Sequence, residues 1–277
     1  MKTLALSSGR RIPVIGQGTW GMGEVRANRE AEITALRLGL DLEMTLIDTA
    51  EMYGEGGAEE VVGEAIAGRR AAVFLVSKVY PHNATRPGAV AACERSLRRL
   101  KTDHLDVYLL HWRGSAQLVE TLEGFQSLKH SGKILDYGVS NFDEDDLEEA
   151  FALPGGDEIV TDQVLYNLMR RGIERDLLPW CRERRIPIMA YSPIEQGALL
   201  KNRLLKLIAS RHASTPAQVA LSWLLQKTGI VAIPKASSAA HVRENRASLD
   251  LELTAEDLAE LDRAFPPPDK KIPLEMI

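Results

Sequence analysis

The chain has 277 residues, of which 45% are hydrophobic and 26% are charged, as in ordinary globular proteins. Its formal net charge of -5 excludes the basic surplus that nucleic-acid binding requires. No apolar run reaches the roughly 20 residues of a membrane span, and the N-terminus lacks the long apolar segment of a secretory signal. We therefore expect a cytoplasmic protein without nucleic-acid or membrane partners. Cys93 and Cys181 lack metal-type spacing and are interpreted as reduced packing residues.

Eight short apolar runs alternate with amphipathic helical stretches along the chain. Such runs indicate strands of a parallel sheet that is buried on both faces, and eight of them predict a closed (β/α)8 TIM barrel, an α/β fold. We expect one domain over residues 1-277, with extra helices at 199–212 and 254–265 and a short, proline-rich C-terminal tail. The predicted strands are IPVIGQG (12–18), TLIDTA (45–50), AVFLVSK (72–78), LDVYLLH (105–111), KILDYGVSN (133–141), EIVTDQV (158–164), IPIMAYSP (186–193) and IVAIPKA (230–236).

Polar residues stand at the ends of these strands, where barrels carry their chemistry. Asp48, Lys78 and His111 end three consecutive strands, and Tyr53 follows Asp48 on the next loop. If the strands are neighbours, these four side chains converge on one rim. The later strands end in Ser140, Asn141, Gln163, Tyr191, Ser192 and Lys235.

The first four residues could form acid–base machinery for a carbonyl group. An ammonium group lowers the pKa of a nearby phenol, and a carboxylate keeps a buried ammonium charged. Asp48 would thus keep Lys78 charged, and Lys78 would lower the pKa of Tyr53. Tyr53 would then exchange a proton with the substrate. His111 could orient or polarise the carbonyl oxygen. Together with a hydride donor, this set would perform a reduction.

Each residue also has a purely structural interpretation. Asp48 alone could be a helix cap or turn residue, Lys78 could only pair with Asp48, and His111 could be a core histidine beside Trp112. Their joint position at adjacent strand ends favours the functional interpretation.

Gly16, Gly18 and Gly21 spell G-x-G-x-x-G, the dinucleotide fingerprint of doubly wound folds. In that motif the third glycine opens a helix, whereas here the helical pattern begins near Arg29. An acidic residue at the end of the next strand, about 20 residues on, is also missing. We interpret this stretch as part of the barrel rim, with Trp20 facing the substrate.

The sequence resembles the aldo-keto reductase family over nearly its whole length, and looks most similar to short bacterial members that reduce small aldehydes and methylglyoxal. The resemblance implies that Tyr53 is the catalytic acid, with Asp48, Lys78 and His111 as its partners. It is carried by GQGTWGMGE, LIDTAEMYGEGGAEEVVGEAI, FLVSK, LDVYLLHW, GVSNF, DQVLYN, AYSPI and IPKASSAAHVREN.

The resemblance also implies a nicotinamide cofactor, with NADPH preferred and NADH possible. Ser140, Asn141 and Gln163 would hold the carboxamide, and Tyr191 would stack on the nicotinamide ring. The pyrophosphate would lie along residues 192–199, which include Ser192, Gly197 and Leu199. The adenosine end would contact Lys235, Ser237, His241, Glu244 and Asn245. The family usually has arginine at the position of His241 and serine at that of Ala236, so the contacts with a 2′-phosphate are expected to be weaker here.

We expect a reductase of aldehydes or reactive ketones, chiefly small dicarbonyls and aromatic aldehydes, with no metal. Trp20, Tyr80 and Trp112 should wall the substrate pocket, and the protein should be a monomer or weak oligomer. Two alternatives remain: an alcohol dehydrogenase that works mainly in the oxidative direction, and a non-enzymatic regulatory barrel subunit. A metal-dependent hydrolase is disfavoured because only His111 and Asp48 offer ligands at the strand ends.

Overall fold

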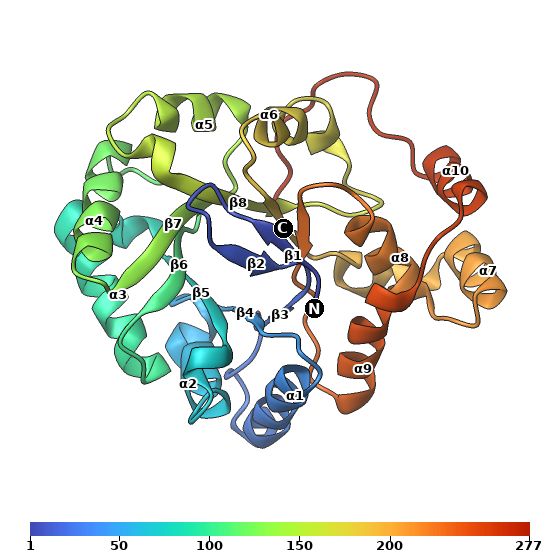
Figure 1. Cartoon of the computed structure of the whole chain (residues 1–277), viewed down its shortest axis with the longest axis horizontal. Coiled ribbons are helices and arrows are strands. Elements are labelled where there is room, and N and C mark those ends of the chain that lie inside the picture. The colour runs from blue at the N-terminus through green and yellow to red at the C-terminus, as the bar shows by residue number, and fades with distance from the viewer.

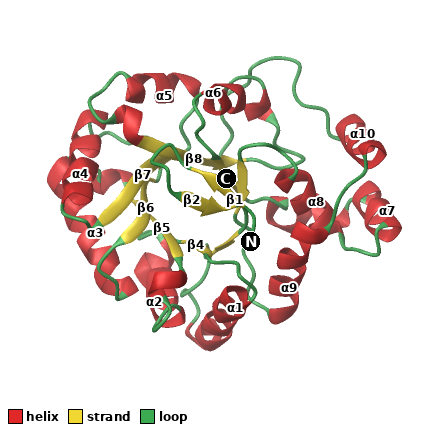
Figure 2. Ribbon diagram, in the orientation of Figure 1, coloured by secondary structure: helices red, strands yellow, loops and turns green.

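Eight parallel strands form the centre of the molecule, and helices surround them (Figure 1, Figure 2). The computed structural model describes all 277 residues. Neighbouring strands follow the chain order, and bridges from Ile15 to Ala232 and from Gly18 to Lys235 bring the two ends of the sheet together. The (β/α)8 barrel predicted from the sequence is therefore confirmed. Its strands are β3 (Gly16–Gly18), β4 (Leu46–Asp48), β5 (Phe74–Val79), β6 (Leu105–Leu110), β7 (Ile134–Ser140), β8 (Ile159–Leu165), β9 (Ile188–Tyr191) and β10 (Ile230–Ala232).

The helices follow the strands in turn, with two additions. α7 (Arg203–Arg211) precedes the barrel helix α8, and α10 (Ala255–Ala264) follows α9, so both extra helices predicted from the sequence are present. Thr215 and Thr254 begin α8 and α10 with reciprocal capping boxes. The other helices are α1 (Arg29–Asp41), α2 (Gly57–Ala65), α3 (Arg86–Leu100), α4 (Leu118–His130), α5 (Glu144–Phe151), α6 (Leu177–Glu183), α8 (Pro216–Leu225) and α9 (Ala239–Ala247).

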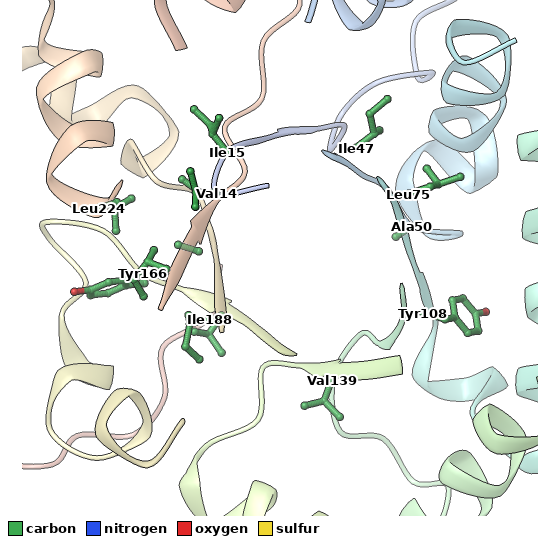
Figure 3. Packing of buried hydrophobic residues seen from close by; sticks show 14 of the residues in the cluster. Val14, Ile15, Ile47, Ala50, Leu75, Tyr108, Val139, Tyr166, Ile188 and Leu224 are labelled. Atoms are coloured by element: carbon green, nitrogen blue, oxygen red, sulfur yellow. The ribbon is translucent and has the colours of Figure 1, made fainter. Parts of the chain in front are cut away.

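The alternation of side chains along the strands divides the core into two clusters. Ile47, Leu75 and Tyr108 belong to the larger cluster of 62 residues, which fills the space between strands and helices (Figure 3). Residues of the opposite parity form an inner cluster of 11, which includes Leu46, Val76, Val107 and Leu109. Because successive strand residues point to opposite faces, the parity of a residue decides whether it faces the barrel interior.

Several observed strands are shorter than the predicted runs, and one predicted strand is divided in two. The run at 12–18 is divided between β2 (Arg11–Pro13), which pairs with β1 (Thr3–Ala5) in an antiparallel hairpin, and β3 of the barrel. Leu6 and Ile12 are buried in the inner cluster, so the hairpin contributes to the barrel interior from outside the eight strands. Continuous hydrophobicity did not reveal this division, because both parts of the run are buried.

The local backbone structure explains why glycine occupies two positions of the G-x-G-x-x-G run. A Cβ on Gly18 would lie 2.8 Å from the carbonyl oxygen of Ile233, so only glycine permits this approach to the strand on the other side of the closure. Gly21 has a φ of +76°, which L side chains rarely adopt. The segment between Gly21 and the 3-10 turn at Arg26–Asn28 is irregular, and α1 begins at Arg29 as predicted.

The chain after α10 has no regular secondary structure, as expected, and its end projects onto the centre of the barrel (Figure 1). None of the helices has the length and apolar character needed to cross a membrane.

Candidate active site

Asp48, Lys78 and His111 occupy positions whose side chains point into the barrel. Asp48 lies two residues after Leu46, Lys78 two after Val76, and His111 two after Leu109, and all three of these apolar residues belong to the inner cluster. Because β4, β5 and β6 are adjacent and parallel, the three polar side chains meet at the carboxyl end of the barrel.

Lys78 connects the members of this group. Its fully buried Nζ donates to Asp48 Oδ2 at 2.9 Å, to the carbonyl oxygen of Thr49 at 2.9 Å and to the Tyr53 hydroxyl at 3.1 Å. These three acceptors use all three ammonium hydrogens. The Tyr53 oxygen is therefore an acceptor in this contact, which leaves its own hydrogen free for another partner. Gln163 Nε2 donates to the other Asp48 oxygen at 2.7 Å.

Burial dominates the pKa of the Tyr53 hydroxyl, which is raised above its ordinary value. Lys78 lowers this pKa, as the sequence predicts, but by less than burial raises it. Burial alone would lower the pKa of Lys78, yet attraction to Asp48 and Tyr53 and the hydrogen bonds with them reverse the direction and raise it. At neutral pH the site thus holds a protonated phenol beside a charged ammonium group.

His111 is neutral at physiological pH. Burial, with a smaller contribution from the Lys78 charge, lowers its pKa to about 2. Its ring meets that of Tyr53 edge-on, with centroids 5.6 Å apart. Nδ1 is buried without a hydrogen-bond partner, which leaves Nε2 as the nitrogen that a ligand can reach. A neutral imidazole with its hydrogen on Nε2 can donate to a carbonyl oxygen.

Asp48, Tyr53 and His111 line a cavity of about 480 Å³, whereas Lys78 lies buried behind them and does not line it. Trp20 and Trp112 line it, as predicted, and Trp20 is 58% exposed at the rim. Tyr80 does not line the cavity, but its ring packs edge-on against Trp112 with centroids 5.1 Å apart. Gly21, Met52, Met276 and Ile277 also line the cavity.

Seven of the residues assigned to the cofactor line the same cavity. They are Ser140, Asn141, Gln163, Tyr191, Ser192, Gly197 and Lys235. Tyr191 donates to Asn141 Oδ1 at 2.9 Å, and Ser140 donates to the carbonyl oxygen of Gln163 at 2.8 Å. The Gln163 amide oxygen has no hydrogen bond from the protein, so it can accept one from a carboxamide. These donors and acceptors beside an aromatic ring fit a nicotinamide.

Apart from Lys235, the residues assigned to the adenosine end do not line this cavity. Ser237 is exposed just before α9, and His241, Glu244 and Asn245 lie on that helix. Leu199 is buried in the core, so its side chain does not reach the cavity either. Their cofactor roles stay predictions.

Sequence reasoning missed three groups of this site. The Thr49 carbonyl accepts from Lys78, and nothing in the sequence marks a backbone acceptor. Met276 and Ile277 reach the cavity from the far end of the chain, and a tail without periodicity gives no indication of its path. Met52 lies next to Tyr53 on the same loop, and this neighbouring position is the only feature of the sequence that could have indicated its place in the cavity.

Comparison with known proteins agrees with this geometry. The family model described as "Aldo/keto reductase family" matches residues 14–265. The methylglyoxal reductase YeaE of Escherichia coli is 52% identical over 281 residues, covering 100% of this chain and 99% of the relative. The glyoxal reductase of Bacillus subtilis is 35% identical, covering 97% of this chain and 96% of the relative.

Solved structures extend the likeness to three dimensions. An aldo/keto reductase from Klebsiella pneumoniae, crystallised in complex with NADP and acetate, is 49% identical and superposes with a TM-score of 0.97, with coverage of 100% of this chain and 99% of that one. A second structure from the same organism, with the same identity and TM-score, contains NADPH. From its fold, its strand-end residues and these relatives, the chain belongs to the aldo/keto reductase family and is an oxidoreductase.

Proposed function

We propose that the protein is an NADPH-dependent reductase of aldehydes and reactive dicarbonyls, with Tyr53 as the proton donor. The observation that carries the proposal is the Tyr53 hydroxyl, which accepts from Lys78 and keeps its own hydrogen free at the edge of the cavity. The names of the relatives that reduce methylglyoxal and glyoxal support the substrate class.

We assign a step to each of these side chains. His111 Nε2 and the Tyr53 hydroxyl orient the substrate by hydrogen bonds to its carbonyl oxygen. When bound, the nicotinamide supplies a hydride to the carbonyl carbon. As charge develops on the oxygen, Tyr53 transfers its proton there, which leaves a phenolate and yields the alcohol. Lys78 then stabilises the phenolate, and Asp48 keeps Lys78 charged.

Neutral His111 suits this role. A histidine that lost a proton to the substrate would have to be charged beforehand, and a pKa of about 2 prevents that at neutral pH. The residue therefore orients the carbonyl through a hydrogen bond and leaves the proton transfer to Tyr53.

Several side chains support binding of the nicotinamide cofactor. Gln163, Asn141 and Ser140 offer hydrogen bonds for the carboxamide, and Tyr191 offers an aromatic face. Lys235 is an exposed cation at the same cavity. We assign it to the 2′-phosphate of NADPH, with His241 nearby in sequence as a weaker contributor than an arginine because an imidazole cannot grip a phosphate with two parallel hydrogen bonds.

The test is a steady-state assay of NADPH consumption by the purified full chain. Methylglyoxal, 4-nitrobenzaldehyde and the corresponding alcohols would be compared with both nicotinamide cofactors. Faster reduction with NADPH than with NADH supports the proposal. A protein without turnover in either direction would instead point to a regulatory subunit, and one that only oxidises alcohols would point to a dehydrogenase.

A further inference from the structure

Arg170 connects two segments that both line the catalytic cavity. Its Nε donates to Glu195 Oε1 at 2.9 Å, and another guanidinium nitrogen donates to Glu275 Oε1 at 2.6 Å. Glu195 lies in the loop between β9 and α7 (residues 192–202, the β9–α7 loop), and Glu275 lies in the tail (residues 266–277).

The β9–α7 loop is conformationally strained where it meets the cavity. Ser192, Glu195 and Gln196 have φ values of 47°, 49° and 49°, in the left-handed region that residues other than glycine rarely adopt. Asn167 Nδ2 donates to the Ser192 carbonyl at 2.9 Å and to Glu195 Oε2 at 2.7 Å. With Arg170 on the other Glu195 oxygen, both carboxylate oxygens are fixed from outside the loop.

The turn that carries Asn167 and Arg170 is itself well defined. Asn167 is fully buried, and its Oδ1 accepts from the backbone N–H of Met169 at 2.8 Å and of Arg170 at 3.2 Å. A backbone hydrogen bond of 3.0 Å from Arg170 to the Asn167 carbonyl closes the turn. The guanidinium therefore extends from a fixed base.

Arg170 differs from the other cations that hold the tail. Arg171 donates to the Phe265 carbonyl at 2.6 Å, Arg175 donates to the Pro268 carbonyl, and Lys271 pairs with acidic residues that include Asp176. None of these three contacts the β9–α7 loop. Arg170 alone holds both segments, and Glu275 immediately precedes Met276 and Ile277, which line the cavity.

We propose that Arg170 is a positioning residue that couples cofactor binding to substrate binding. A ligand that holds the β9–α7 loop in place also holds the Glu195 carboxylate in place. That carboxylate fixes the position of the Arg170 guanidinium, which in turn fixes the end of the tail through Glu275. By linkage, a substrate held by the tail tightens cofactor binding by the same factor. The inference rests on the proposed function and adds to it that the β9–α7 loop contacts the cofactor and the tail contacts the substrate.

The test measures binding without turnover. NADP⁺ has no hydride to donate, so 4-nitrobenzaldehyde is not consumed in its presence. The Kd of 4-nitrobenzaldehyde would be measured by titration calorimetry, once for the free full-length protein and once for the NADP⁺ complex. The ratio of these two Kd values is the coupling factor. Arg170→Met and Glu275→Ala should each lower this factor by about two- to fivefold, as expected for partly exposed ion pairs.

Arg175→Met is the matched control, because Arg175 holds the tail without touching the β9–α7 loop. Its coupling factor should equal that of the wild type. Arg170→Lys keeps the charge but cannot span two carboxylates, so its coupling factor should resemble that of Arg170→Met. If Arg170→Met does not fold, Arg170→Lys and Glu275→Ala together test the proposal. Circular dichroism would verify the fold of each variant.

An unchanged coupling factor in both Arg170→Lys and Glu275→Ala would overturn the proposal, and so would an equal fall in Arg175→Met. These outcomes are separate from failure of the proposed function. A wild-type protein that binds no NADP⁺ would contradict that function, whereas the coupling factor does not depend on turnover or on the proton donor.

Discussion

The Lys78 ammonium group donates to the Tyr53 hydroxyl at 3.1 Å while it forms an ion pair of 2.9 Å with Asp48. Both charged partners are buried, so the pair is as much a part of the folded core as of the chemistry. A substitution at Lys78 should therefore affect both turnover and stability.

Lys78→Met should abolish most turnover and also destabilise the protein. It removes the cation that stabilises the Tyr53 phenolate and leaves the Asp48 carboxylate buried without its ion-pair partner. Breaking a buried pair from one side typically costs about 3–5 kcal/mol. The free energy of unfolding in urea would be measured beside the reduction rate.

The double variant Asp48→Leu/Lys78→Met is the control for stability. Removal of both charges should restore much of the unfolding free energy without restoring turnover, because an apolar replacement of a buried pair is often tolerated. A Lys78→Met protein with wild-type turnover would show that the ion pair is only structural.

The rate of reduction should be nearly constant from about pH 6 to about pH 9. Reduction needs protonated Tyr53, whose pKa is raised above its ordinary value by burial, so the proton donor is lost only as the pH rises through that high value. His111, with a pKa of about 2, titrates far below this range. The profile of kcat against pH would be recorded with 4-nitrobenzaldehyde, and a decline centred near neutrality would contradict these assignments.

Lys235→Ala should raise the KM for NADPH more than the KM for NADH. Lys235 is the one exposed cation among the residues that line the cavity, and only NADPH has a 2′-phosphate to attract it. Both KM values would be measured for the variant and the wild type under the same conditions. Equal changes in the two KM values would remove Lys235 from the phosphate site.

Small dicarbonyls and aromatic aldehydes should be reduced with higher kcat/KM than steroid ketones. The residues proposed to bind the nicotinamide line the same cavity of about 480 Å³, and the large side chains of Trp20, Met276 and Ile277 line it too. The sequence suggests a tail that covers the pocket only partly, and the structure brings its last two residues to the lining. A panel of these substrates at saturating NADPH would show the order, and a preference for steroids would refute it.

The sequence was most informative where chemistry follows strand periodicity. Asp48, Lys78 and His111 could be placed on one rim because each ends an apolar run with inward parity, and adjacent parallel strands bring such residues together. The hairpin β1–β2 could not be separated from β3, since Ile12 is as deeply buried as a barrel residue. Contacts between distant irregular segments, such as Arg170 with Glu275, have no periodicity that a sequence pattern could reveal.

Asn141 shows a further limit. Its φ of 58° turns the chain sharply at the end of β7, and its amide nitrogen donates to the carbonyl oxygen of His111 at 3.1 Å. Asparagine tolerates this left-handed conformation better than most residues. The sequence indicates a polar strand end here, but not that this side chain supports the strand end that carries His111.

The most direct test of the account compares Tyr53→Phe with the wild type, using methylglyoxal and NADPH. Phenylalanine keeps the ring packed against His111 but removes the proton that the carbonyl oxygen must receive. We predict that kcat falls by about 100- to 10,000-fold, the usual contribution of general acid catalysis, while the Kd for NADPH stays close to that of the wild type. Undiminished kcat in a Tyr53→Phe protein that binds NADPH normally would contradict the central claim that Tyr53 is the proton donor.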